Sequence, residues 1–369
     1  MNGCFAGFIG TYTQGGRAQG IYAFKLHPES GVIADLRLAA ESVNPAYLAI
    51  SPSKKHLYVT NETNKFEGAV SAFALEGDGL RFLNQQPSKG TSPCHVAINN
   101  EATHAVVANY MSGTLCVLPL EPAGALGEPV QVIRFTGSGP NRERQEASHA
   151  HFFMFDSHNN YGFACDLGAD RVMAYSFDKD AAAPLSPAAV PWVSTKPGAG
   201  PRHGVFHPAG TCAYYVNELD STVDVLRYTP SGGTTAKGST SAGTFEKLQC
   251  IATLPPGVQV FNTAAAIRIS PDGNFVYTSN RGHDSITIFK VNNITGALDY
   301  ILTVPSGGKT PRDFTIDPTG NLLLACHQDS DNLVIFRIDK PTGRLTPLRE
   351  YTVPSPVCVV VGDPESMLD

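Results

Sequence analysis

The sequence predicts an all-β protein, a seven-bladed β-propeller closed by a composite blade that both termini form. A short strand pattern, in which apolar and polar residues alternate, returns seven times along the chain. A second pattern, an apolar strand, a turn and another apolar strand, precedes six of the seven copies. Units of about 45 to 60 residues, with about four short strands each, are typical of propeller blades.

Outer strands are expected where the alternating pattern recurs. They begin at Gly20, Ala69, Gly113, Arg171, Ser221, Ser285 and Asn332. Innermost strands are expected where a shorter apolar run, often opened by proline, recurs. They begin at Pro45, Pro93, Ala150, Pro201, Ala264, Pro311 and Pro356.

The two ends of the chain have complementary gaps in this pattern. PVCVVV, from Pro356, has no outer strands after it, whereas FIGTYT, from Phe8, has no inner strand before it. The simplest arrangement is a composite blade in which the C-terminal strand is innermost and the N-terminal strands lie outside it. Such a blade joins the termini by main-chain hydrogen bonds and protects sheet edges that would otherwise be exposed.

The composition agrees with a single propeller domain over residues 1–369. The 35 glycines and 27 prolines suit many tight turns, and a charged fraction of 16% suits extensive burial of the sheets. The segment from Ser231 to Thr244 is rich in Gly, Ser and Thr without periodicity, so we expect a flexible loop there.

Charge and cysteine usage argue against several classes of protein. The net charge is −6 and no basic run interleaved with aromatic residues occurs, so a nucleic-acid partner is not expected. No apolar run reaches about 18 residues and the N-terminus lacks a secretory signal pattern, so we expect no membrane association and a cytoplasmic location. Eight cysteines without a CxxC pair indicate buried, reduced thiols.

Three motifs that would indicate other chemistry are incomplete. GGKT at Gly307 lacks the earlier glycine of a phosphate-binding loop, because Thr303 occupies that position. No GxSxG element is present, so a serine-hydrolase nucleophile is not supported. His149 and His151 form an HxH pair, but no motif supplies a third ligand, and we expect neither a metal nor a cofactor.

Polar side chains coincide when the predicted blades are superimposed. The second position of the inner strands holds Ala46, Cys94, His151, Arg202, Ala265, Arg312 and Val357. The end of the next strand holds Glu62, Tyr110, Leu167, Glu218, Arg281 and His327. Consecutive strands of a blade are antiparallel, so both positions lie at one end of the propeller. We therefore expect six side chains to crowd one mouth: His151, Arg202, Glu218, Arg281, Arg312 and His327.

The residues alone leave two interpretations of this cluster. Arg281 and Glu218 could form a structural salt bridge between blades. Alternatively, because several arginines packed together are costly unless a ligand completes the pairing, the cluster is a binding site. Arginine forks suit carboxylate or phosphate, and a carboxylate beside an imidazole suits proton transfer, which favours a small anionic substrate. The insertion TGSGPNRERQEASHA, with Arg142 and Arg144, is either a solvated connector or a cap over one mouth.

Four segments carry a family resemblance: GAGPRHGVFHP from Gly198, YVNELDSTVDV from Tyr215, ISPDGNFVYTSNR from Ile269 and PRDFTIDPTG from Pro311. The chain resembles the lactonase family of seven-bladed propellers over almost its whole length. That family includes cycloisomerase-type bacterial 6-phosphogluconolactonases and fungal carboxymuconate-lactonizing enzymes. The resemblance implies a catalytic site composed of His151, Arg202, Glu218 and Arg281.

The segment SHAHFFMFDSHNN departs from the family pattern, which more often has a small polar residue where Phe152 stands. We expect Phe152 to narrow or reshape the pocket. Either His149 or His151 would project inward after a one-residue slip, and His151 is preferred because it shares the column of Arg202. Strand alternation directs His203 between blades, beside the site.

The resemblance implies hydrolysis of a sugar lactone, with 6-phosphogluconolactone of the pentose phosphate pathway as the leading substrate. Glu218 or His151 would accept a proton from water, one arginine would stabilise the oxyanion and the other would hold the phosphate. The residues expected to bind substrate are Arg202, Arg281, Arg312, His149, His203 and His327. The alternatives are a carboxymuconate-type cycloisomerase that uses the same residues and a non-catalytic propeller that binds a protein. The oligomeric state stays open.

Overall fold

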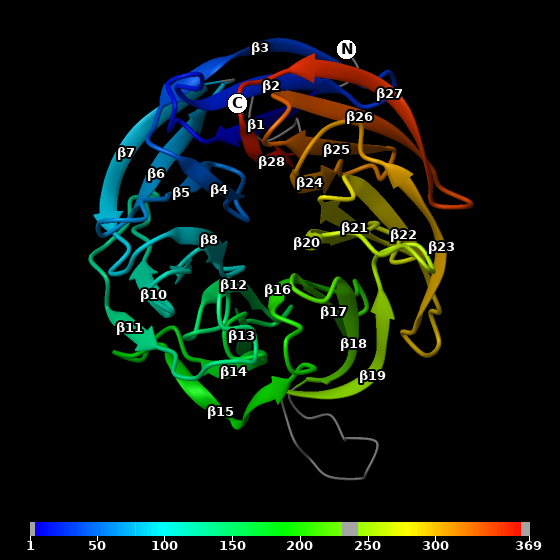
Figure 1. The fold of residues 1–369 in the computed structure, drawn as a ribbon. Coiled ribbons are helices and arrows are strands. Elements are labelled where there is room, and N and C mark those ends of the chain that lie inside the picture. Colours follow the sequence, from blue (N-terminus) through cyan, green and yellow to red (C-terminus); the bar gives the residue numbers. More distant parts are fainter. Residues whose placement is uncertain (1–3, 78, 231–242, 363–369) are drawn as a thin grey trace.

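The computed structural model describes residues 4–77, 79–230 and 243–362. Their strands form seven four-stranded antiparallel sheets around a common axis, and no helix occurs in these ranges (Figure 1). The predicted all-β, seven-bladed propeller is confirmed. We number the blades 1 to 7 by their innermost strands in chain order.

Each blade runs outward from the axis. Blades 1 and 2 are β4 (Pro45–Ile50), β5 (His56–Asn61), β6 (Ala69–Glu76), β7 (Gly79–Pro87) and β8 (Pro93–Ile98), β9 (His104–Asn109), β10 (Thr114–Pro119), β11 (Gln131–Arg134). Blades 3 and 4 are β12 (Ala150–Phe155), β13 (Tyr161–Asp166), β14 (Arg171–Phe177), β15 (Leu185–Ser194) and β16 (Pro201–Phe206), β17 (Cys212–Asn217), β18 (Thr222–Thr229), β19 (Thr244–Ala252). Blades 5 and 6 are β20 (Thr263–Ile269), β21 (Phe275–Arg281), β22 (Ser285–Val291), β23 (Leu298–Pro305) and β24 (Pro311–Ile316), β25 (Leu322–His327), β26 (Asn332–Asp339), β27 (Arg344–Thr352). Blade 7 is β28 (Pro356–Gly362), β1 (Phe5–Thr11), β2 (Gly20–His27) and β3 (Val32–Glu41).

Blade 7 is the predicted composite blade. The C-terminal strand β28 is innermost and pairs antiparallel with β1, with Phe8 opposite Val360 (Figure 1). Strands from the two ends of the chain therefore share one sheet, as the complementary gaps in the pattern indicated. The loop expected over 231–244 lies mostly outside the described residues, and its last residue, Thr244, begins β19.

The inner strands begin with a recurrent irregular turn. In five of the seven blades the residue before the inner strand has a positive φ, for example 40° at Asn44, 55° at Ser92 and 58° at Thr310. The register with the second strand then shifts, as it does between Pro201 and His203. Such a β-bulge bends the strand and changes the direction of the extra residue's side chain. The register shift recurs in all seven blades, and the residues that it leaves unpaired include Ala46, Cys94, His151, Arg202, Ala265, Arg312 and Val357.

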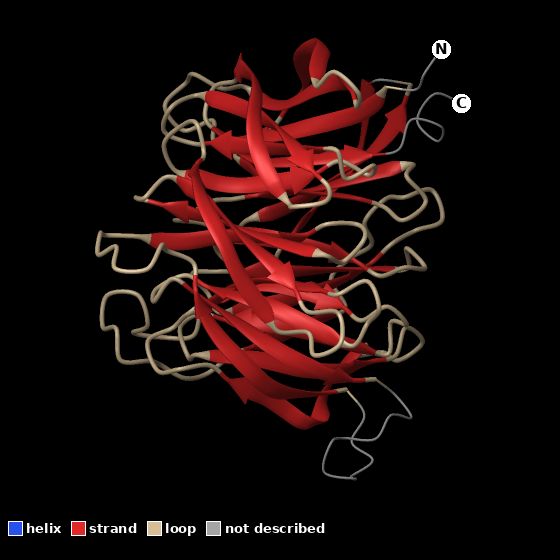
Figure 2. Cartoon of the chain, turned by 90° about the vertical axis from the view of Figure 1, so that its right-hand side faces the viewer, coloured by secondary structure: helices blue, strands red, loops and turns tan. Residues whose placement is uncertain are grey.

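The hydrophobic core lies between neighbouring sheets, because each sheet is apolar on both faces. Phe275 and Tyr277 of blade 5, for example, pack in one cluster with Phe314 and Leu323 of blade 6. Burying one such side chain contributes about 1.5–3 kcal/mol to folding. Figure 2 shows the strands crossing the molecule and the connecting loops on its two faces. Loop residues on one of these faces are therefore brought together around the axis.

All eight cysteines are unpaired, and six of them are buried, while Cys4 is half-buried and Cys250 is exposed. Burial raises the pKa of thiols such as Cys165 and Cys326, so they stay protonated. In the described ranges, no helix has the length and apolarity needed to cross a membrane.

Candidate active site

A repeated main-chain hydrogen bond places the two polar columns side by side at one mouth of the propeller. The residue that follows the second strand donates its N–H to the residue that precedes the inner strand. In blade 4 the Glu218 N–H bonds the Gly200 carbonyl at 2.7 Å, and in blade 2 the Tyr110 N–H bonds Ser92 at 2.9 Å. Gly200 has a φ of +65°, and a Cβ there would lie 2.7 Å from Leu219, so this turn favours glycine.

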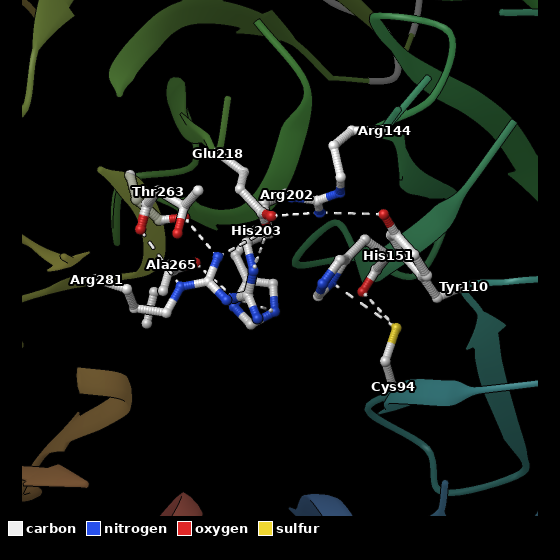
Figure 3. A network of polar contacts seen from close by, with 12 residues as sticks. Cys94, Tyr110, Arg144, His151, Arg202, His203, Glu218, Thr263, Ala265 and Arg281 are labelled. Carbon is white, nitrogen blue, oxygen red and sulfur yellow. Dashed lines mark hydrogen bonds and ion pairs between the residues drawn. The ribbon is translucent and has the colours of Figure 1, made fainter. Parts of the chain in front are cut away.

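Glu218 contacts three arginines, Arg144, Arg202 and Arg281 (Figure 3). Together with Arg312, whose charge acts on Arg202 and Arg281, they form what we call the arginine cluster. The Oε2 of Glu218 lies 3.0 Å from Nε of Arg202 and 2.9 Å from an Nη of Arg281. Its Oε1 accepts a hydrogen bond of 2.5 Å from Arg144. The Glu218 side chain is 3% exposed, so its carboxylate oxygens are shielded from water, whereas Arg144 is partly exposed.

These contacts determine the charge of Glu218. Burial by itself would raise the pKa of this carboxyl group, but the guanidinium groups of Arg281, Arg202 and Arg144 outweigh burial and hold the pKa well below its ordinary range. Glu218 is therefore ionised at neutral pH and is a weak proton acceptor. Its geometry suits the orientation of arginines better than general-base chemistry.

Main-chain carbonyls fix the two inner arginines. Arg202 is 2% exposed and donates to the Ala265 carbonyl at 2.6 Å, while Arg281 donates to the carbonyls of Thr263 and Ala264 at 3.3 Å each. Burial, together with the positive charge of Arg281, lowers the pKa of Arg202 to about 9. Desolvation and the neighbouring guanidinium of Arg281 thus outweigh the stabilising charge of Glu218 at Arg202.

Arg312 has the fewest partners in the cluster. Its guanidinium lies 5.2 Å from the ring centroid of Tyr12, and it makes no hydrogen bond or ion pair with another described residue. The Tyr12 hydroxyl donates to the Glu62 carboxylate at 2.6 Å. The N–H donors of Arg312 are therefore available to an anion at this mouth.

His151 lies beside the cluster with one ring nitrogen free. Its Nδ1 is 3.8 Å from Sγ of Cys94, and its Nε2 has no hydrogen-bond partner among the residues that the structure describes. Burial and then the charge of Arg202 lower the pKa of His151 well below its ordinary value. The imidazole is thus neutral at pH 7, the state required of a proton acceptor.

The structure separates the two candidate histidines of the HxH pair. The His149 ring is stacked on Tyr110 at 4.5 Å, with Nδ1 3.0 Å from the Tyr110 carbonyl and Nε2 3.1 Å from Glu146. Within the described part of the chain, His149 makes no hydrogen bond or ring contact with the arginine cluster, whereas the rings of His151 and His203 are 5.3 Å apart. His151, not His149, therefore lies with Arg202.

The expected direction of His203 is wrong. Strand alternation placed it between blades, but its ring contacts Tyr47 of blade 1 and His95 of blade 2, so it projects across the axis. The bulge at Arg202 interrupts alternation, so both side chains point inward. The Arg202 guanidinium lies 3.2 Å from Nε2 of His203 (Figure 3). Phe152 packs against His203 at 5.3 Å, on the inner side of the cluster.

The placement of His327 at the mouth is also wrong. His327 is paired with Pro311, so it matches Asn217 and Asn280 of other blades rather than Glu218. The side chains of those asparagines bond to loops and third strands, away from the cluster. The true member of the column is Gln328, whose N–H bonds the Thr310 carbonyl at 3.1 Å.

Arg144 is the cluster member that the blade superposition missed. It comes from the insertion before β12, whose cap interpretation agrees with its contacts to Glu218 and to the Tyr110 hydroxyl at 3.1 Å. Arg142 of the same insertion is exposed. The insertion has no strand periodicity, so no register was available from which to choose between the two arginines. The only indication of Arg144 in the sequence was that the insertion carries arginines and precedes an inner strand of the predicted anion site.

Comparison with known proteins agrees with this architecture. A model of the family described as "Lactonase, 7-bladed beta-propeller" matches residues 6–361. The chain belongs to this lactonase family. The resemblance inferred from the GPRH and NEL segments is thereby confirmed.

Relatives of this lactonase chain include a protein of Bacillus subtilis named 6-phosphogluconolactonase. The two are 39% identical, and the match covers 96% of this chain and 97% of the relative. A solved structure from Bacteroides fragilis, provisionally assigned as a 6-phosphogluconolactonase, is 34% identical with a TM-score of 0.89, covering 98% and 99% of the chains. The periplasmic gluconolactonase of Pseudomonas aeruginosa is 29% identical with a TM-score of 0.89 and the same coverage.

The arginine cluster and His151 do not resemble a metal site. Within the described ranges, no group of three or more His, Cys, Asp or Glu side chains is arranged to hold a metal ion. What the mouth provides is a set of N–H donors from arginines and a neutral imidazole. Such donors stabilise a developing oxyanion, and a neutral imidazole accepts a proton.

Proposed function

We propose that the arginine cluster hydrolyses a phosphorylated sugar lactone, 6-phosphogluconolactone, to 6-phosphogluconate. The names of the relatives support a lactone hydrolase. The main support for a phosphorylated substrate is the positive charge of the mouth. Among the described residues, four guanidinium groups lie there with only two carboxylates, those of Glu218 and Glu62. A phosphate monoester, with close to two negative charges at neutral pH, balances this excess. This substrate is consistent with the cytoplasmic location and the role in the pentose phosphate pathway that we expect from the sequence.

The hydrolytic step needs a base and an oxyanion site. In our proposal His151 Nε2 takes a proton from water as the water oxygen bonds to the lactone carbonyl carbon. The carbonyl oxygen becomes an oxyanion that Arg202 and Arg281 stabilise. When the bond between that carbon and the ring oxygen breaks, the imidazolium returns its proton to the departing oxygen, which becomes the hydroxyl group of the product.

Magnitudes support the division of labour between His151 and Glu218. A positioned general base contributes about 10²- to 10⁴-fold in rate, and one oxyanion donor about 10²- to 10³-fold. The low pKa of Glu218 makes that carboxylate a poor base, but three guanidinium groups contact it. We therefore assign proton transfer to His151 and the orientation of the arginines to Glu218.

Two substrates distinguish the proposal from the alternatives. Purified protein is assayed with 6-phosphogluconolactone and with 3-carboxymuconate, each against its uncatalysed rate, because such lactones hydrolyse spontaneously. We expect acceleration of lactone hydrolysis alone. Turnover of 3-carboxymuconate alone would indicate a cycloisomerase. If the folded protein turned over neither substrate, the non-catalytic propeller that binds a protein would be the remaining alternative.

A further inference from the structure

Arg144 differs from the other arginines that contact Glu218 in its exposure. Its side chain is 37% exposed, compared with 2% for Arg202 and 14% for Arg281. It alone approaches Oε1 of Glu218, whereas Arg202 and Arg281 share Oε2. Arg144 is therefore the most exposed of the three guanidinium groups that contact Glu218, and it reaches that carboxylate from the side of Tyr110, opposite Arg281 (Figure 3).

The main chain that carries Arg144 is firmly anchored. The Asn141 carbonyl accepts the N–H groups of Arg144 at 3.2 Å and of Gln145 at 2.7 Å, which closes a tight turn. Gln145 is fully buried, and its amide donates to the Leu167 carbonyl at 2.9 Å and to the Asp170 carboxylate at 2.8 Å. The turn therefore projects the arginine from a fixed base, and the freedom at this position belongs to the long side chain.

Glu218 does not depend on Arg144 for its charge balance. The guanidinium groups of Arg202 and Arg281, which lie within 3.0 Å of its Oε2, still balance its charge if Arg144 moves away. A phosphate that enters the mouth offers Arg144 an acceptor with a larger charge and room for a bidentate contact. Transfer of the guanidinium from the carboxylate to the phosphate is therefore favourable.

We propose that Arg144 is the specificity-determining residue that recognises the phosphate of the substrate. In the free enzyme its guanidinium bonds Glu218 and Tyr110; with substrate it moves to the phosphate, while Arg202 and Arg281 face the lactone carbonyl. The inference rests on the proposed hydrolysis and adds the residue that distinguishes a phosphorylated lactone from an unphosphorylated one. An uncharged sugar lactone gives Arg144 no partner better than Glu218.

The test compares two lactones in three variants. Arg144→Met removes the charge at similar length, and Arg144→Lys keeps the charge but loses the fork. Arg142→Met is the matched control, because Arg142 lies in the same turn, is exposed and makes no polar contact with other described residues. The substrates are 6-phosphogluconolactone and glucono-δ-lactone, and melting curves check that each variant is folded.

We expect Arg144→Met to lower kcat/KM for 6-phosphogluconolactone by about 10- to 100-fold, the range for a lost hydrogen bond to a charged group. The value for glucono-δ-lactone should change by less than about threefold, with Arg144→Lys intermediate and Arg142→Met like the wild type. Equal losses on both lactones, or no loss on the phosphorylated one, would overturn the proposal.

Calorimetric binding of the product 6-phosphogluconate separates this inference from the proposed function. A Kd raised by about 10- to 100-fold in Arg144→Met supports phosphate recognition even if the wild type hydrolyses neither lactone. A raised Kd without any turnover would refute the proposed hydrolysis and leave the role of Arg144 in phosphate recognition intact. An unchanged Kd would refute the role of Arg144, whatever the turnover.

Discussion

Glu218 and His151 illustrate how neighbours decide the role of a titratable residue. Both were candidates for the base from sequence, because a carboxylate and an imidazole are equally suited in principle. The structure surrounds Glu218 with three guanidinium groups that hold its pKa well below the ordinary range. It leaves Nε2 of a neutral His151 without a partner among the described residues. Residue type alone could not reveal this difference, which depends on contacts between blades.

Replacing His151 by Gln should remove the base. We expect kcat for 6-phosphogluconolactone to fall by about 10²- to 10⁴-fold, while the Kd for 6-phosphogluconate changes little, because the arginines remain. His149→Gln is the matched control, since that histidine stacks on Tyr110 outside the cluster, and it should lose less than about tenfold. Similar losses in the two variants would show that the proton goes elsewhere.

The pH dependence should report the environment of His151. Its pKa lies well below the ordinary 6.5, so the ring stays unprotonated as the pH falls through that value. We expect kcat/KM, corrected for spontaneous hydrolysis, to be level from pH 8 to below pH 6.5 and to decline only at lower pH. A decline centred at or above pH 6.5 would contradict this assignment.

Glu218→Gln should affect stability as well as turnover. The change leaves Arg202 and Arg281 buried without their carboxylate, and loss of one partner of a buried ion pair costs about 3–5 kcal/mol. The folded-state pKa of Glu218 is depressed, so the carboxylate contributes stability above its unfolded pKa, near 4.3, and loses it as the pH falls toward the folded pKa. Urea unfolding should therefore show a larger deficit at pH 7 than at pH 3.5. If the loss of unfolding free energy in Glu218→Gln were equal at pH 7 and pH 3.5, the charge of Glu218 could not be its cause.

At the scale of strands, the sequence predicted the order of elements well and the direction of single side chains less well. The period of two located the inner strands because alternation reflects burial directly. It failed at His203, because a bulge at Arg202 adds one residue that alternation does not count. A one-residue misalignment likewise moved His327 into the column that Gln328 occupies. Loop hydrogen bonds, which sequence periodicity does not reveal, decide such positions.

The composite blade predicts a sharp effect of truncation. Deleting residues 355–369 removes β28, the innermost strand of blade 7, and exposes the edge of β1 to solvent. We expect cooperative thermal unfolding to be lost. Deletion of 363–369 alone leaves β28 complete and should melt like the full chain. A 355–369 deletion that melted like the full chain would contradict the closure of the ring by both termini.

At the scale of the whole molecule, the mouth is positively charged although the chain carries a net charge of −6. The ring was predictable because seven repeats require closure, and three of the four arginines of the cluster, Arg202, Arg281 and Arg312, followed from superimposing the blades. Arg144 did not follow, because its insertion belongs to no repeat. Function therefore depends partly on a segment outside the pattern that specifies the fold.

The local positive charge predicts sensitivity to salt. Screening shortens the Debye length from about 20 Å at 0.02 M salt to about 6 Å at 0.3 M. We expect the KM for 6-phosphogluconolactone to rise by about fivefold over this range, because attraction of an anion to the arginines weakens. The KM for glucono-δ-lactone, which is uncharged, is the control and should stay constant. Equal effects on both lactones would argue against recognition of the phosphate by charge.

The most direct test is a ³¹P NMR time course of 6-phosphogluconolactone at pH 7 with the wild type, with His151→Gln and without protein. We expect the wild type to convert the lactone to 6-phosphogluconate at about 1–10³ turnovers per second, the range of ordinary enzymes. The variant should approach the spontaneous rate. A folded wild-type protein whose time course matched the protein-free sample would contradict the assignment of lactone hydrolysis to this cluster.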